Sequence, residues 1–132
     1  MSTPFWCVFI SAVLIFIARV PVTSAMKAQG YDNHLPRRQQ LQLDGLGARA
    51  VAAHQNSFEA FIVFSVGVLM AHATQTQGYL IDTLAIIFVI CRVIYLLLYW
   101  ADLAWQRSLV WFIGLLCSLL LMLSPTFRQL LA

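Results

Sequence analysis

The sequence has 132 residues, of which 61% are hydrophobic and only 10% are charged, and its mean hydropathy is +0.83. A soluble domain of this length carries about 25% charged residues, so the composition excludes an ordinary soluble protein and indicates a polytopic membrane protein. The net charge of +3 is too small and too scattered for nucleic-acid binding, and no nucleic-acid partner is expected. We therefore expect one all-α integral membrane domain over residues 1–132.

Four apolar segments are close to the roughly 20 residues that a helix needs to cross the hydrocarbon core. Helices are expected because lipid offers no hydrogen-bond partner to an open backbone. Pro21 is expected to kink the first helix or to mark its end, and Ser124 with Pro125 is expected to end the fourth. The predicted four-helix bundle has its helices at about 5–25, 48–73, 80–103 and 107–123.

The links between these segments differ in charge. The link at 26–47 is long and polar and holds Lys27, Arg37 and Arg38, whereas the link at 74–79 holds no basic residue. Lys and Arg accumulate at the cytoplasmic ends of membrane helices. We therefore expect the loop 26–47 on the cytoplasmic side and both termini on the non-cytoplasmic side.

Polar residues enter the second apolar segment in an ordered way. At about 100° per residue, Arg49, Asn56 and Glu59 fall within roughly 80° of each other and form one stripe. Glu59 lies roughly 15 Å along the helix axis from Arg49, below the membrane surface. A carboxylate at that depth costs several kcal/mol unless it is paired or protonated, so we interpret Glu59 as functional.

The third segment carries a matching stripe. Arg92 lies at about the same depth as Glu59 and has the opposite charge, so we predict that the two residues face each other, directly or through a bound polar molecule. Tyr95 and Tyr99 follow Arg92 at i+3 and i+7 and share its face. The two stripes are expected to line one crevice that opens toward the cytoplasm.

This crevice suits a zwitterionic, peptide-like ligand. Guanidinium groups bind carboxylates, and Glu59 would bind an ammonium group. A Glu–Arg pair that only fastens two helices together is the alternative, but it uses just two of the polar groups. No cluster of side chains suggests a metal site, and none is expected. Small residues beside the first stripe are expected to allow close helix packing without a chemical role: Ala53, Ser57, Ala60 and Gly67.

Three motifs together resemble one family. They are RAVAAHQNSFE at 49–59, RVIYLLLY at 92–99 and RS at 107–108. In this order they resemble the MAPEG family, the membrane-associated proteins in eicosanoid and glutathione metabolism. The loop YDNHLPR at 31–37 is similar to the bacterial branch, and the resemblance covers about residues 5–125.

The resemblance implies a homotrimer in the bacterial inner membrane, with glutathione as co-substrate between neighbouring subunits and a lipophilic small molecule as second substrate. It implies a membrane-bound glutathione transferase of the microsomal type, with transferase or peroxidase activity toward lipophilic electrophiles or hydroperoxides. Arg107 matches the arginine before Ser that contacts the glutathione sulfur, so it is the implied catalytic residue. The implied glutathione-binding residues are Arg49, Asn56, Glu59, Arg92, Tyr95 and Tyr99.

The implied role of Arg107 is physically reasonable. Lowering the pKa of a thiol from about 8.5 to about 6.5 takes about 2.7 kcal/mol. One charge-assisted hydrogen bond from a guanidinium supplies about 1.5–3 kcal/mol. One well-placed arginine is therefore sufficient.

One position departs from the family pattern. Animal members carry an arginine four residues before the motif asparagine, where this sequence has Ala52. Loss of that guanidinium favours the alternative of a non-catalytic lipid- or ligand-binding scaffold with the same fold. A small proton-coupled exporter is a third hypothesis, but such exporters carry their glutamate on the first helix and lack an arginine-rich crevice.

Overall fold

The computed structural model describes residues 1–131, with the side chains of all of these except 128, 129 and 131. Over this range the chain is helical and contains no strand. Short turns join most of the helices, and a polar connection joins the first to the third. The helices are α1 (Thr3–Ala28), α2 (Pro36–Gln40), α3 (Gly45–Ala73), α4 (Tyr79–Trp100) and α5 (Ala104–Leu131).

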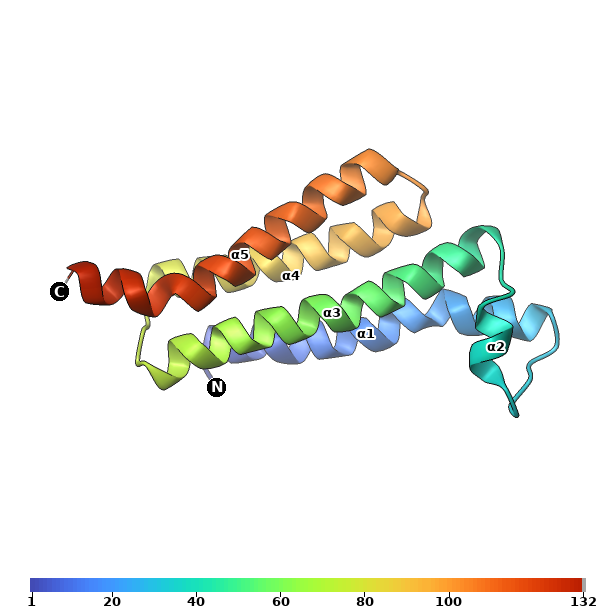
Figure 1. Ribbon diagram of the computed structural model, residues 1–132, viewed down its shortest axis with the longest axis horizontal. Helices are drawn as coiled ribbons and strands as arrows, with labels where there is room; N and C mark the ends of the chain where they lie inside the picture. The colour runs from blue at the N-terminus through green and yellow to red at the C-terminus, as the bar shows by residue number, and fades with distance from the viewer. Residues whose placement is uncertain (132) are drawn as a thin grey trace.

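The four long helices lie side by side and alternate in direction (Figure 1). α1 packs against α3 and α4, and α5 packs against the same two helices. Both termini lie at one end of the bundle, and α2 and the α4–α5 turn lie at the other (Figure 1). The two termini therefore lie at the same end, as the alternating helices require, and the side of the membrane that they face stays a prediction.

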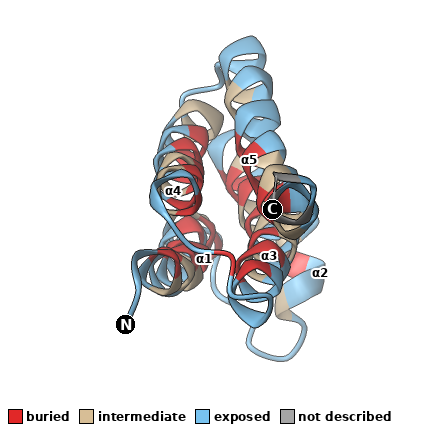
Figure 2. Cartoon of the chain, turned by 90° about the vertical axis from the view of Figure 1, so that its left-hand side faces the viewer, coloured by how far each residue is buried: buried red, intermediate tan, exposed pale blue. Residues whose placement is uncertain are grey.

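Within the described residues, α1, α3, α4 and α5 are each long and apolar enough to cross a membrane. Buried residues face the bundle interior, and the outward faces are exposed (Figure 2). Large apolar side chains stand on those outward faces, for example Phe16, Ile62 and Phe112. In water such a surface would be strongly unfavourable, whereas lipid solvates it. The predicted fold class, a bundle of four membrane-spanning helices, is confirmed.

The expected end of the fourth helix at Ser124 and Pro125 is wrong, because α5 continues through Pro125 to Leu131. A proline at this position cannot donate a hydrogen bond to the carbonyl of Leu121, four residues earlier. The Ser124 hydroxyl donates to that carbonyl at 2.8 Å instead. In lipid this substitution keeps the backbone satisfied, so the helix can continue. α1 likewise continues past Pro21 to Ala28.

The polar connection between α1 and α3 is more ordered than a simple loop. It contains α2, whose Gln39 is buried against the end of α1. The Gln39 side-chain amide donates to the carbonyls of Met26 and Gly30, and its oxygen accepts from the backbone N–H of Asp32. These bonds tie α2 to the last turn of α1 and to the residues that follow it, and they fold the connection over that end of the bundle.

Gly67 sets the closest approach between α3 and α5. A Cβ atom at this position would lie 2.9 Å from the backbone oxygen of Ser118 and 3.0 Å from the Cβ of Leu121. Backbone atoms cannot move aside as a flexible side chain can. The expectation that Gly67 permits close helix packing is therefore confirmed.

We expect Gly67→Ala to lower the stability of the bundle by about 1–3 kcal/mol, because α5 must move away from α3. Gly114→Ala is the matched control. Its Cβ would meet Cys91 at 3.5 Å and Phe88 at 3.8 Å, which are ordinary contacts. Thermal unfolding in detergent measures both variants, and equal midpoints for the two would contradict the close contact described here.

Candidate functional site

Arg92 is the centre of the candidate site. It lies in α4 within the membrane-spanning region and is only 5% exposed. One guanidinium nitrogen donates to Oδ1 of Asn56 at 3.0 Å, and another donates to Oγ of Ser57 at 3.3 Å. The guanidinium carbon lies 4.1 Å from the centre of the Tyr95 ring. Arg92 is thus held by polar partners on α3 and by an aromatic face on its own helix.

Asn56 connects Arg92 to Glu59. Its amide nitrogen donates to the Glu59 carboxylate at 3.3 Å while its oxygen accepts from Arg92. Within the described residues, Glu59 and Arg92 form no direct ion pair. The neutral Asn56 amide therefore links the two opposite charges, with one hydrogen bond to each of them.

The Glu59 side chain is exposed on the outer surface of the single chain, although it lies inside a membrane-spanning helix. Lipid is a poor solvent for a carboxylate, and the Asn56 amide is a single neutral partner. The geometry therefore leaves Glu59 able to accept further donors from a molecule that covers this face of α3.

A second set of contacts continues from Tyr95 toward the membrane surface. The rings of Tyr95 and Tyr99 meet edge to face, with their centres 5.5 Å apart. The guanidinium carbon of Arg107, in the first turns of α5, lies 4.2 Å from the centre of the Tyr99 ring. The two tyrosines thus link Arg92 to Arg107 along one side of α4.

Arg49 lies apart from these contacts. It donates to the backbone oxygen of Trp100 at 3.3 Å and lies 3.8 Å from the Asp102 carboxylate. It therefore ties α3 to the α4–α5 turn rather than to Asn56. Two neighbouring donors, Nε of Arg49 and Nε1 of Trp100, are enclosed without a protein acceptor.

A cavity of about 90 Å³ adjoins the site between α3, α4 and α5. Its polar wall is formed by Asn56, Glu59 and Arg92, and its apolar wall includes Phe88 and Trp111. The charged centre is therefore continuous with a small apolar space. Among the described residues, no cluster of three or more His, Cys, Asp or Glu is arranged to hold a metal ion.

Ser57 was not predicted as a site residue. The sequence indicated a packing role, and the structure adds a hydrogen bond from Arg92 to its hydroxyl. The Ser57 hydroxyl itself donates to the carbonyl of Ala53 at 2.8 Å, which directs its lone pairs toward Arg92. The sequence feature that could have indicated this contact is the position of Ser57, directly after Asn56 and near the expected depth of Arg92.

The sequence profile of the MAPEG family matches residues 3–127. The chain belongs to the MAPEG family. The match spans α1, α3 and α4 completely and most of α5, so it includes every residue of the site described above. No curated protein and no solved structure matches the chain.

Membership in the MAPEG family and the four apolar helices together make this a multi-pass integral membrane protein. The family was predicted from the motifs around Arg49, Arg92 and Arg107, and that prediction is confirmed. The structure brings Asn56, Glu59 and Arg92 of this MAPEG protein together. It places Tyr99 and Arg107 beside each other about two helical turns away, and it holds Arg49 at the α4–α5 turn.

Proposed function

We propose that this MAPEG protein is a membrane-bound, glutathione-dependent transferase or peroxidase. The observation that carries the proposal is the connected set of charges that runs from Glu59 through Asn56 and Arg92 to Arg107. Two helices could be fastened together with a single neutral hydrogen bond. A carboxylate and two guanidinium groups in one membrane bundle favour a ligand that carries both signs of charge.

Glutathione has the groups that this site would accept. Its two carboxylates would bind guanidinium groups, and its amino group would bind the Glu59 carboxylate. Arg92 uses two of its donors on Asn56 and Ser57, and a guanidinium has five N–H groups, so donors remain for a ligand.

A homotrimer is part of the proposal, because another subunit would shield the exposed Glu59 carboxylate from lipid. In a single chain in lipid, this carboxylate would face acyl chains and be unstable. A neighbouring subunit over α3 would exclude lipid and enclose glutathione between the two chains. We place the end with Lys27, Arg37, Arg38 and Arg107 on the cytoplasmic side of a bacterial inner membrane, where basic residues accumulate and glutathione would enter.

Arg107 would act on the thiol. Its guanidinium would stabilise the thiolate, whose sulfur would attack an electrophilic carbon and form a C–S bond while the leaving group departs with the bonding electrons. With a hydroperoxide, the thiolate would attack the terminal oxygen and release the alcohol; a second glutathione would then give the disulfide and water. Lipophilic substrates would arrive from the bilayer in which they dissolve.

Glutathione binding to the purified protein tests this function. We expect calorimetry to detect binding, and we expect Glu59→Gln to weaken it about tenfold through loss of a charge-assisted bond to the amino group. Asp44→Asn removes the same charge from the exposed N-terminus of α3 and is the matched control. Absence of binding at millimolar glutathione would contradict the proposal and leave the scaffold hypothesis standing.

The scaffold alternative is favoured by Ala52, which stands where animal members have an arginine. A MAPEG protein that binds a lipid or another ligand without catalysis could keep Arg92 and Asn56 as a binding centre. Conjugation of a chromogenic electrophile with glutathione separates the two functions, since only the enzyme accelerates it.

A further inference from the structure

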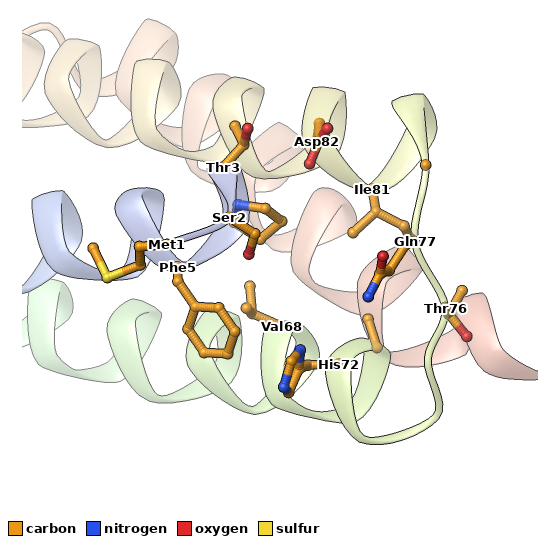
Figure 3. A pocket seen from close by; sticks show the side chains of 13 residues that line it. Met1, Ser2, Thr3, Phe5, Val68, His72, Thr76, Gln77, Ile81 and Asp82 are labelled. Atoms are coloured by element: carbon orange, nitrogen blue, oxygen red, sulfur yellow. The ribbon is translucent and has the colours of Figure 1, made fainter.

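A large cavity lies at the end of the bundle opposite the candidate site. It has a volume of about 500 Å³ and is enclosed by the start of α1, the end of α3, the α3–α4 loop and the start of α4 (Figure 3). Its walls include apolar side chains, such as Phe5, Val68 and Ile81, and polar ones, namely His72, Gln77 and Asp82. The volume is within the range of about 300–1,000 Å³ that is typical of ligand pockets.

This cavity opens where the apolar helices end, at the level expected for lipid headgroups. Thr3 begins α1 and Ala73 ends α3, so both spans terminate at its rim. Tyr79 is 87% exposed beside it, and exposed aromatic residues with a polar tip occur at membrane–water boundaries. A headgroup at this level would keep its acyl chains along the apolar helix faces.

Asp82 is the acidic residue of the cavity wall. Asp82 is half-buried in the first turn of α4, and its carboxylate accepts no hydrogen bond from any side chain that the structure describes. Among the residues that the structure describes, no lysine or arginine lines the cavity, and the amino terminus at Met1, which does line it, forms no ion pair with Asp82. His72 packs edge-on against Phe5, with ring centres 4.9 Å apart, and it lies on the α3 wall across from Asp82 on the α4 wall (Figure 3). The wall thus offers one carboxylate without an ion-pair partner, together with neutral hydrogen-bonding side chains and the amino terminus at Met1.

We propose that this cavity binds the headgroup of a phospholipid that carries a primary ammonium group, such as phosphatidylethanolamine. The ammonium donates to the Asp82 carboxylate, and the phosphate accepts from His72 and from neighbouring hydroxyl and amide groups such as that of Gln77. A lipid with only a negative charge lacks a counter-ion for Asp82. A quaternary ammonium lacks the N–H groups that a carboxylate prefers. This site is independent of the glutathione-binding function proposed for the other end.

Native mass spectrometry of the full-length protein tests this site. The protein is equilibrated in micelles with equal amounts of phosphatidylethanolamine, phosphatidylglycerol and phosphatidylcholine that have identical acyl chains. We expect phosphatidylethanolamine to be retained about tenfold more than either competitor, and we expect Asp82→Asn to remove that preference. Equal retention of the three lipids by the unmodified protein, or an unchanged preference in Asp82→Asn, would overturn the proposal.

Two further variants separate recognition from folding. Asp44→Asn removes a carboxylate at the opposite end of the bundle and should keep the full preference. His72→Ala removes a phosphate donor from an exposed residue and should reduce retention of phosphatidylethanolamine several-fold at an unchanged melting temperature. Retention at the original level would contradict the phosphate contact.

Addition of water-soluble glycerophosphoethanolamine then shows whether the headgroup alone is recognised. Displacement of the lipid supports recognition of the headgroup alone, and no displacement supports recognition of headgroup and acyl chains together.

Discussion

Arg107→Ala should reduce the rate of glutathione conjugation about a hundredfold, while glutathione affinity falls by no more than a few-fold. The expected loss in rate corresponds to the roughly 2.7 kcal/mol needed to lower a thiol pKa by two units. Arg107 is suited to this role because its guanidinium carbon lies over the Tyr99 ring, 4.2 Å from the ring centre, at the start of α5. The ring restrains the side chain without using its N–H groups, which stay free for a sulfur.

The rate must be measured together with the thiolate itself. Ultraviolet absorbance of bound glutathione reports the thiolate, and its pH dependence should move to higher pH in Arg107→Ala, because the charged form of the thiol loses its stabilising cation. Arg38→Ala removes an exposed arginine of α2 at the same end of the bundle and should leave rate and thiolate unchanged. If the unmodified protein and Arg107→Ala conjugate at the same rate, Arg107 is not the thiol-activating residue.

Much of the fold and part of the site could be predicted from the sequence, since the membrane imposes strong constraints. Apolar segments of fixed length can only be helices in lipid, and alternating direction then fixes the depth of each residue. That depth placed Arg92 at the level of Glu59, and the structure joins these two residues through hydrogen bonds to Asn56. A single charge in an apolar helix needs a polar partner at the same depth, so its partner can be predicted.

Details that depend on the rotation of a helix or on a local hydrogen bond could not be predicted in this way. Ser57 is polar enough to bind Arg92 and small enough to pack, and the sequence does not separate these roles. Pro125 is an unfavourable helix residue in general, but the Ser124 hydroxyl satisfies the carbonyl that it leaves open. Arg49 belongs to the same polar stripe as Asn56, yet it extends to the α4–α5 turn, where the end of α4 presents free carbonyls.

Arg92→Met should weaken glutathione binding about a hundredfold, because the variant removes a charge that would bind a ligand carboxylate in a low-dielectric site. Methionine keeps most of the side-chain volume, so the substitution leaves little empty space and little destabilisation from a cavity. The variant also leaves Oδ1 of the half-buried Asn56 without its donor in the membrane-spanning region, and an unsatisfied acceptor away from water costs about 1–3 kcal/mol. We therefore expect a lower melting temperature in detergent as well as a higher dissociation constant. Unchanged glutathione affinity would exclude Arg92 from the binding site.

A double-mutant cycle on the ligand-free protein decides whether Arg92 and Glu59 form one unit. If Asn56 transmits charge between them, the unfolding free energies of Arg92→Met and Glu59→Gln should be non-additive, with a coupling of about 0.5–3 kcal/mol. Repeating the cycle in an Asn56→Ala background should reduce the coupling, because Asn56 makes the hydrogen bonds that link the two charges and they form no direct ion pair. Additivity within about 0.5 kcal/mol in the original background would mean that the amide only fills space between two independent charges. A coupling that falls when Asn56 is lost would instead mean that the Asn56 amide holds Arg92 and Glu59 as one prearranged pair of opposite charges.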